Sequence, residues 1–183
     1  HGAALTRIGI VSKHNLSAAS GTLAELETWL RDRGVPTTWT AEAAALMPTG
    51  ARRVVERKAI AQEADLVLVL GGDGTLLSAA RLVADSKKNV PIFGVNLGRP
   101  GSMAEVSLDE LYANLEKALA GKLQAEERMM LMAGIIRRGK KVSEYNVLND
   151  AVISKGAIAR MVSLEVSVGE DYLTSIRADG LIL

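Results

Sequence analysis

The segment with the most chemical content is Gly71-Gly72-Asp73-Gly74-Thr75, which directly follows the apolar run Leu66–Leu70. Glycines let a backbone turn sharply and approach a ligand closely, because they carry no Cβ. The first N–H groups of a helix lack intrahelical partners and carry partial positive charge, so a helix starting here offers donors to a phosphate. The pattern predicts a strand, a phosphate-binding turn and a helix from Thr75 to about Asp85.

Asp73 is unexpected in such a turn, because a carboxylate repels phosphate oxygens. It suits the site if it holds a metal ion, takes a proton, or acts as the general base for a hydroxyl group that is being phosphorylated. The alternative is that Asp73 only caps the helix, since Asp is a favoured N-cap residue and Gly-Asp-Gly also occurs in ordinary turns.

Composition narrows the function classes. The 183 residues suffice for one domain, or for one domain and part of another, and 48% hydrophobic residues support a real core. A net charge of +1 and 3% aromatic residues argue against nucleic-acid binding. Without cysteine there are no disulfides or thiolate metal sites, and the two histidines have no partner at a metal-ligand spacing. Because no apolar stretch approaches the roughly 20 residues that span a bilayer, we expect a cytoplasmic protein without membrane contacts.

Strand and helix patterns alternate over residues 1–121, which predicts an α/β domain with a parallel sheet covered on both faces. The predicted strands are Arg7–Ser12, Val35–Trp39, Asp65–Leu70 and Val90–Val95. The predicted helices, besides the one after the glycine turn, are Ser17–Arg33, Ala51–Glu63 and Leu108–Ala120. Arg57 and its basic neighbours are expected to form the solvated face of the second of these helices.

The pattern changes in residues 122–183, where short apolar and β-branched runs predict the start of an antiparallel β-rich domain. These runs are Leu131–Arg137, Val142–Ile153, Met161–Val168 and Tyr172–Ile176. Turns at Arg138-Gly139-Lys140 and Gly169-Glu170-Asp171 suggest two hairpins. The last residues, Leu181-Ile182-Leu183, are apolar, and a β domain cut there leaves a strand edge uncovered, which indicates a piece of a longer protein.

Three further segments complete a recognisable set: Val95–Gly101, Leu148–Ile153 and Arg177–Ile182. With the glycine-rich turn, their order and spacing over nearly the whole chain resemble bacterial NAD kinases, truncated before the C-terminal part. The turn alone is less specific, since diacylglycerol kinases, sphingosine kinases and phosphofructokinases carry similar ones. The resemblance implies an N-terminal α/β domain followed by a β-rich domain. It also implies transfer of the γ-phosphate of ATP to the 2′-hydroxyl of the adenosine ribose of NAD, which gives NADP.

The resemblance assigns Asp73 as the base that accepts the 2′-hydroxyl proton, with Gly74 lining the same nucleotide site. Asn149 and Asp150 match the family's Asn-Asp/Glu motif, which contacts NAD. Their chemistry suits ribose hydroxyls or an adenine amino group, because an amide both donates and accepts and a carboxylate accepts two hydrogen bonds. From the local sequence alone, the alternative is that the pair is only a polar break in a β-strand.

Arg160, Arg177 and Asp179 match further NAD-binding positions of the family. A guanidinium suits phosphate or ribose contacts. From the local sequence, Arg160 fits a surface arginine at a strand start equally well. For Arg177 and Asp179, the alternative is an exposed turn that begins the final strand. Lys155 is expected to be a solvated loop lysine.

The family reaction implies ATP and NAD as ligands, Mg²⁺ or another divalent cation, and a homo-oligomer, dimer or tetramer, for the full-length protein. No complete set of metal ligands is visible, so the ion is inferred from phosphoryl transfer. Two alternatives stay open: a lipid kinase of the diacylglycerol type, and a catalytically inactive nucleotide-binding fragment.

The sequence departs from the family in two places. In the loop after Asn96, family members usually have Gly-x-Leu-Gly-Phe-Leu, whereas this chain has Gly98-Arg99-Pro100-Gly101-Ser102-Met103. The chain therefore lacks the aromatic ring that shapes the adenine side of the NAD site in the family. The family also continues past the Asp-Gly motif into a Thr-Pro-Thr-Gly-Ser-Thr-Ala-Tyr segment, which this chain does not contain.

Overall fold

The computed structural model describes residues 5–13, 19–97, 103–104, 106–158 and 160–183. The chain forms two compact units, the first ending at Arg128 and the second spanning Met129–Leu183. Each unit is described by itself. The domain boundary after residue 121 stays a prediction of the sequence.

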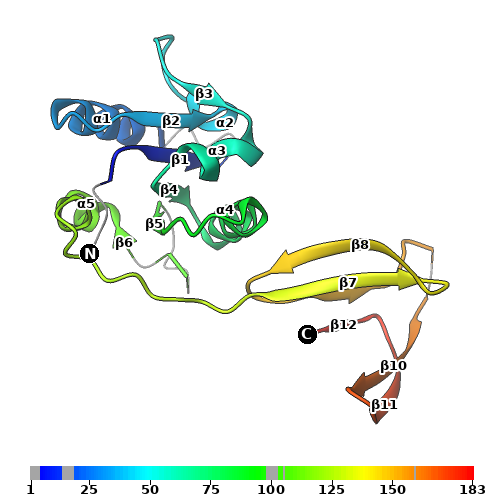
Figure 1. Ribbon diagram of the computed structural model, residues 1–183. Helices are drawn as coiled ribbons and strands as arrows, with labels where there is room; N and C mark the ends of the chain where they lie inside the picture. Colours follow the sequence, from blue (N-terminus) through cyan, green and yellow to red (C-terminus); the bar gives the residue numbers. More distant parts are fainter. Residues whose placement is uncertain (1–4, 14–18, 98–102, 105, 159) are drawn as a thin grey trace. The chain divides into compact units, whose positions relative to one another are not determined.

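The first unit is built on a six-stranded parallel sheet with the strand order β3-β2-β1-β4-β5-β6 (Figure 1). Its strands are β1 (Ile8–Ser12), β2 (Thr37–Thr40), β3 (Val54–Val55), β4 (Leu66–Gly71), β5 (Ile92–Asn96) and β6 (Val106–Ser107). Its helices are α1 (Ala19–Asp32), α2 (Ala41–Ala44), the 3₁₀ turn η1 (Arg57–Ala59), α3 (Ile60–Glu63), α4 (Asp73–Ser86), the 3₁₀ turn η2 (Leu108–Glu110) and α5 (Leu111–Leu119). The predicted parallel α/β domain is confirmed. No helix in the described part of the chain combines the length and the apolar character needed to cross a membrane.

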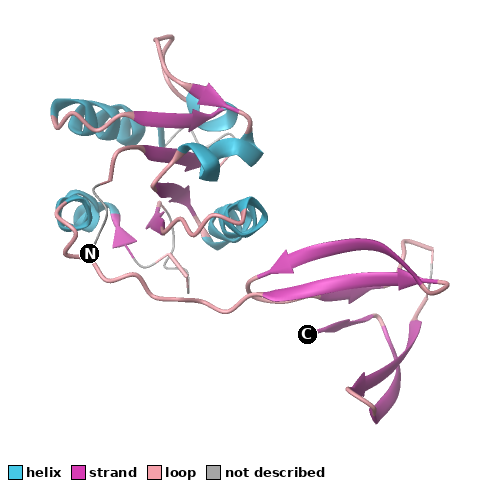
Figure 2. Ribbon diagram, in the orientation of Figure 1, coloured by secondary structure: helices cyan, strands magenta, loops and turns pink. Residues whose placement is uncertain are grey.

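Burial of β4 on both faces organises this unit. Successive side chains of a strand point to opposite faces, and here Leu66, Leu68 and Leu70 pack in a core that includes α1 and α5. Val67 and Val69 pack in the other core, which includes α3 and α4. Figure 2 shows the strands as a central layer with helices on both sides. The continuous apolar run of β4 is therefore that of a doubly covered central strand.

The predicted helix over residues 51–63 is wrong. Val54 and Val55 instead form the short edge strand β3, and only Ile60–Glu63 is α-helical. The carbonyl oxygen of Arg53 accepts a hydrogen bond from the Trp39 N–H at 2.8 Å, so the sheet edge takes up backbone groups that a helix would have paired internally. Two adjacent β-branched residues also favour a strand.

The strand order reverses between β1 and β4, the two central strands. Ser12, the last residue of β1, lies in register with Leu70, and the Lys13 N–H donates to the Leu70 carbonyl oxygen at 3.1 Å. In open α/β sheets, ligands bind outside the carboxyl ends of the strands at such a reversal. The fold thus predicts a ligand site formed by residues that follow β1 and β4.

The second unit consists of three antiparallel strand pairs. They are the hairpin β7 (Leu131–Arg137) with β8 (Lys140–Val147), the hairpin β10 (Val162–Val168) with β11 (Asp171–Ala178), and the ribbon of β9 (Val152–Ser154) with β12 (Gly180–Ile182). Both predicted hairpin turns are confirmed. Arg138 and Gly139 have φ values of 51° and 74°, as a two-residue turn of type I′ requires. The predicted run 142–153 is not one strand, because β8 ends before Asn149 and Asp150 and β9 begins after them.

Asp65 ties the start of β1 to the start of β4. Its Oδ2 accepts hydrogen bonds from the N–H groups of Thr6 and Arg7, each at 3.0 Å, and from the Thr6 hydroxyl. The Thr6 hydroxyl bond, followed by the two backbone bonds and the charge of Lys88, lowers the pKa of Asp65 below 3.8, although desolvation opposes it. The folded state therefore favours the ionised carboxylate.

We expect Asp65→Asn to lower the free energy of unfolding at pH 7 by about 1 kcal/mol, because charge-assisted hydrogen bonds are lost at a partly exposed site. A lowered folded pKa stabilises the protein above the unfolded pKa, and this contribution is lost as the pH falls through the folded value. Urea unfolding at pH 7 and near pH 3 measures the difference between variant and wild type, which should shrink at the lower pH. The loss should also shrink in a Thr6→Ala background. An equal loss at both pH values would contradict this account.

Gly180 allows the closest backbone approach in the β9–β12 ribbon, since a Cβ at this position would collide with the carbonyl oxygen of Ile153. We expect Gly180→Ala to open the ribbon and to speed amide hydrogen exchange at Ala151 and Lys155, whose N–H groups donate to Leu183 and Asp179. Gly134→Ala is the matched control, because a Cβ on this β7 residue meets no atom within 4 Å. Equal exchange in both variants would refute the steric explanation.

Candidate active site

The glycine-rich turn lies where β4 ends at Gly71 and α4 begins at Asp73. A Cβ on Gly71 would lie 2.6 Å from Thr75 Oγ1 and 2.9 Å from Thr75 Cβ, so only glycine allows this close approach of the strand end to the first helical turn. A Cβ on Gly72 or Gly74 would meet no atom within 4 Å. Gly71 thus closes the turn, whereas Gly72 and Gly74 leave open space beside the start of the helix.

Asp73 is the first residue of α4, two residues before the predicted helix start. Gly72 is the N-cap residue and has no side chain to cap the helix. The alternative in which Asp73 serves as the N-cap is therefore wrong. The carboxylate is partly exposed, and its Oδ1 accepts a hydrogen bond from the Met103 N–H at 3.2 Å. Negative charge is favoured at this end of a helix.

The neighbouring strand β5 ends beside the same turn. Asn96 lies in register with Gly71, and the Leu97 N–H approaches the Gly71 carbonyl oxygen at 3.4 Å. The segment that departs from the family pattern begins at residue 98, and its residues 98–102, including Pro100, lie outside the described part of the chain. The Met103 contact thus connects Asp73 to the β5 side of the turn.

A pocket of about 510 Å³ lies on the other side of the turn, over the carboxyl ends of β1 and β4. This volume is within the range of about 300–1,000 Å³ that is usual for small-molecule sites. Its lining comes from β1, α2, η1 and the first turns of α4: Ser12, Lys13, Glu42, Arg57, Gly72, Gly74, Thr75 and Ser78. The position matches the reversal of strand order, where this class of fold binds ligands.

The polar groups of this pocket are only partly paired. Arg57 donates from Nη2 to Ser78 Oγ at 2.6 Å, and its Nη1 lies 4.0 Å from Glu42 Oε1. Ser12 is 2% exposed, and neither its Oγ nor Glu42 Oε2 has a hydrogen-bond partner among the described residues. Buried polar atoms without partners are uncommon in native proteins. This pocket therefore has unused hydrogen-bonding capacity in the protein alone.

Sequence reasoning missed this pocket. It placed Arg57 on a solvated helix face, whereas the side chain is partly buried and bonded to Ser78. Ser12 and Glu42 carry no recognisable local motif. The one signal that points to them is topological, because they follow or end strands β1 and β2 next to the reversal of strand order.

The predicted NAD-binding residues of the second unit are all exposed and fall at two places on the β9–β12 ribbon or next to it. Asn149 donates to Asp150 Oδ2 at 3.0 Å just before β9, where Ala151 pairs with Leu183. Asn149 and Asp150 thus lie just before β9, whereas Lys155 and its partners lie just after the end of β9.

Lys155 connects the other predicted residues. Its Nζ forms an ion pair with Asp179 Oδ1 at 2.7 Å and donates to the Arg160 carbonyl oxygen at 3.3 Å. Arg177 lies in β11, opposite Ser163. Lys155 is an exposed loop lysine, as expected, and it also connects two of the predicted positions. Asp73 and Gly74 belong to the first unit.

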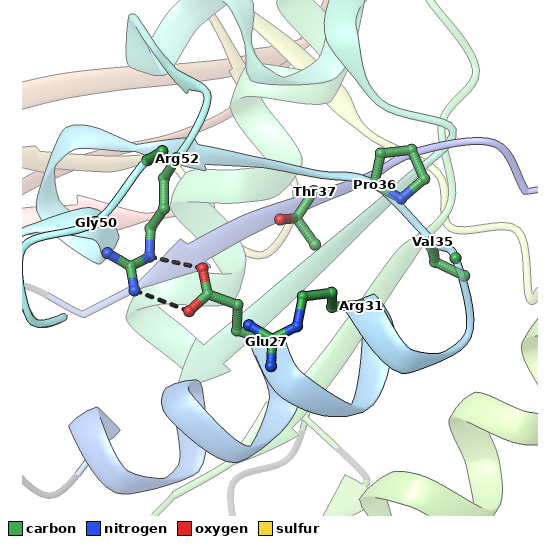
Figure 3. A pocket seen from close by; sticks show the side chains of 9 residues that line it. Glu27, Arg31, Val35, Pro36, Thr37, Gly50 and Arg52 are labelled. Atoms are coloured by element: carbon green, nitrogen blue, oxygen red, sulfur yellow. Dashed lines mark hydrogen bonds and ion pairs between the residues drawn. The ribbon is translucent and has the colours of Figure 1, made fainter.

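A second pocket of about 540 Å³ lies at the opposite end of β2, where α1 and the segment before β3 meet (Figure 3). Here Arg52 donates from Nη2 to Glu27 Oε2 at 2.8 Å, and its Nε lies 2.7 Å from Glu27 Oε1. Its Nη1 also donates to the Pro48 carbonyl oxygen at 2.6 Å. The Arg52 guanidinium is thus held by Glu27 and by the backbone, although its Nε makes no hydrogen bond with the described residues. We interpret this pocket as a structural feature of the sheet edge.

The next question is whether the side chains of the protein could hold a metal ion by themselves. Within the described ranges, no group of three or more His, Cys, Asp or Glu side chains is arranged to hold a metal ion. The described residues thus do not form a protein cage for a divalent cation.

Comparison with known proteins shows a clear family relationship. The family model of the ATP-NAD kinase N-terminal domain matches residues 8–123. The NAD kinase of Geobacter sp. strain M21 is 46% identical over 98% of this chain and 62% of its own length. That of Geobacter sulfurreducens is 43% identical, with the same coverage. The chain thus spans about 62% of the length of these relatives.

Two solved structures share the fold. Yeast NADH kinase complexed with NADH has a TM-score of 0.83 at 17% identity, covering 98% of this chain and 57% of that one. An NAD kinase from Archaeoglobus fulgidus in complex with ATP has a TM-score of 0.67 at 24% identity, covering 96% of this chain and 59% of that one. Together with the family model and the close relatives, this fold shows that the chain belongs to the ATP-NAD kinase family.

Proposed function

We propose that this chain is part of an NAD kinase that transfers the γ-phosphate of ATP to the 2′-hydroxyl of the adenosine ribose of NAD. The observation that carries the proposal is the position of Asp73, a partly exposed carboxylate at the start of α4 beside an open glycine turn. The names of the bacterial relatives, all NAD kinases, support the reaction. The ATP and NADH complexes of the two structural neighbours support the choice of ligands.

Asp73 acts as the general base in this proposal. The 2′-hydroxyl proton passes to its carboxylate while the hydroxyl oxygen forms a bond to the γ-phosphorus. The bond from the γ-phosphorus to the bridging oxygen breaks, and ADP leaves with that oxygen. Phosphoryl transfer has a loose transition state, so a well-placed weak base and good positioning suffice. The Met103 N–H orients the carboxylate, and Gly74 leaves the space that a nucleotide needs.

The second unit supplies the acceptor contacts. Asn149 and Asp150 present an amide and a carboxylate for the hydroxyl or amino groups of NAD, and their mutual hydrogen bond fixes their orientation. Arg160, Arg177 and Asp179 bind further NAD groups. The ion pair of Asp179 with Lys155 holds one carboxylate oxygen in place.

A divalent cation such as Mg²⁺ accompanies ATP in this proposal. Mg²⁺ is commonly held by substrate phosphates with few protein ligands, which agrees with the sparse donor set, and we assign it no step of its own. We place the reaction in the cytoplasm and propose a homo-oligomer, dimer or tetramer, for the full-length protein.

We expect Asp73→Asn to reduce NADP formation from NAD, ATP and Mg²⁺ by at least about 100-fold, the usual contribution of a general base. The loss should appear in kcat more than in the KM of either substrate. Circular dichroism should match the wild type, because Asn can still accept the Met103 hydrogen bond, and thermal stability should fall by no more than about 1 kcal/mol, the usual contribution of a negative charge at a helix N-terminus. An active Asp73→Asn variant would disprove the assignment of the base.

The assay should include this chain and a chimera continued with the C-terminal residues of the Geobacter sp. strain M21 enzyme, because the chain spans 62% of that relative. Activity in either form supports the proposal. Phosphorylation of diacylglycerol in vesicles without any NADP would instead support the lipid-kinase alternative. Nucleotide binding without turnover in both forms would support the inactive alternative.

We expect Gly74→Ala to weaken ATP use while leaving the fold intact or slightly more stable. A methyl group here meets no protein atom within 4 Å but projects beside the pocket that Gly74 lines. Replacing a helical glycine by alanine adds up to about 1 kcal/mol of stability. The KM for ATP and the melting temperature test both effects. A lower melting temperature, or an unchanged KM, would contradict this role for Gly74.

A further inference from the structure

We propose that Lys155 is a positioning residue of the acceptor site, because its ammonium group holds both Arg160 and Asp179, two residues that the proposed function assigns to NAD. The inference rests on that function and deepens it. It adds a residue that acts through two others and makes no contact with NAD of its own. The local sequence predicted only a solvated loop lysine at this position.

Three contacts place Lys155 at the end of the β9–β12 ribbon. Its N–H donates to the Asp179 carbonyl oxygen at 2.9 Å, which continues the register in which Ser154 faces Gly180. Its Nζ lies 2.7 Å from Asp179 Oδ1 and donates to the Arg160 carbonyl oxygen at 3.3 Å. One side chain thus connects the segment after β9 with the junction of β11 and β12.

The contact with Arg160 fixes the backbone of an exposed residue. Arg160 follows Lys155 by five positions, in a segment that belongs to neither β9 nor β10. A guanidinium on a long side chain reaches a phosphate or a ribose in a reproducible way only if its own backbone is held. The hydrogen bond from the Lys155 ammonium to the Arg160 carbonyl oxygen provides that restraint.

The contact with Asp179 serves an electrostatic purpose. The Asp179 side chain is 77% exposed, and an isolated carboxylate would repel the diphosphate of NAD. The adjacent Lys155 ammonium offsets this charge and orients the carboxylate, which can then accept hydrogen bonds from the hydroxyl groups of a ribose. Holding Asp179 also holds the end of β11, the strand that carries Arg177.

The exposure of this ion pair argues that it acts on binding more than on stability. The side chains of Lys155 and Asp179 are 41% and 77% exposed. Exposed ion pairs contribute little to the free energy of unfolding. Side chains that are already ordered lose less freedom when a ligand binds, so the same contacts favour the acceptor complex. Removal of the ammonium group should therefore weaken NAD binding and leave the melting temperature nearly unchanged.

Steady-state kinetics of the chimera test this inference. We expect Lys155→Met to raise the KM for NAD by about three- to ten-fold, the cost of ordering one or two side chains on binding. The kcat and the KM for ATP should stay close to the wild type, because only acceptor binding is affected. Lys155→Arg should restore most of the loss, since it retains a cation that can donate to both oxygens. No rescue by arginine, or a loss confined to kcat, would overturn the inference.

Lys141→Met is the matched control. Lys141 is an exposed lysine of the second unit that forms an ion pair with Glu144, within the other strand pair β7–β8. Its loss should leave the KM for NAD unchanged, with a melting temperature as close to the wild type as that of Lys155→Met. Equal KM values in the two variants, or a lower melting temperature of Lys155→Met without a change in KM, would show that Lys155 is only structural.

A double variant tests whether Lys155 acts through Asp179. Asp179→Asn removes the charge that Lys155 pairs with. If the two residues act together, Lys155→Met combined with Asp179→Asn should raise the KM for NAD by less than the product of the two single effects. A full product would show that the residues act independently and would refute this part of the inference.

Backbone ¹⁵N relaxation of the 183-residue chain, measured without ligand, separates this inference from the proposed function. We expect Lys155→Met, but not Lys141→Met, to increase the fast motion of the Gly156 and Arg160 N–H groups. Unchanged motion refutes the positioning role even if the chimera makes NADP. Increased motion, in a chain and a chimera that make no NADP, supports the restraint by Lys155 and refutes the proposed reaction.

Discussion

The burial of β4 on both faces is the constraint on which the site depends. Its leucines pack in one core and its valines in the other, so no side chain of the strand is available for chemistry along its length. A ligand can reach such a strand only at its ends, and at the carboxyl end of β4 the chain leaves the sheet through the glycine-rich turn. That end lies beside the end of β1 because the strand order reverses between them. The location of the site therefore follows from the packing of the core.

Gly71 allows the helix α4 to start immediately after the end of β4. The side chain of Thr75 packs directly over the Gly71 Cα, so α4 starts as close to the strand end as sterics allow. The helix then begins with no side-chain cap, and the Thr75 and Leu76 N–H groups both donate to the Gly72 carbonyl oxygen. A Cβ on Gly72 or Gly74 would meet no atom within 4 Å, so no side chain fills the space at the start of the helix. A helix N-terminus that is open in this way suits an anion.

Sequence patterns predicted those features that are determined locally. The glycine turn, the alternation of strands and helices and both hairpins depend on residues close in the chain, and each was recognised. The helix expected over residues 51–63 failed because the pairing of β3 with β2 is a long-range contact that outweighs an amphipathic spacing. The pocket was missed for the same reason, since Ser12, Glu42 and Arg57 come from three segments that only the sheet brings together.

The two pockets of the first unit show how a fold distinguishes structural from functional polar groups. At one end of β2, the Arg52 guanidinium forms an ion pair that involves both oxygens of Glu27, and its Nε is the one atom of this pair without a hydrogen bond among the described residues. At the other end, beside β1, the hydroxyl of Ser12 and one oxygen of Glu42 are buried and have no hydrogen-bond partner in the part of the chain that the structure describes. Each unsatisfied group costs about 1–3 kcal/mol. A folded protein tolerates this cost where a ligand restores the missing hydrogen bonds, and the pocket beside β1 holds two such groups among the described residues.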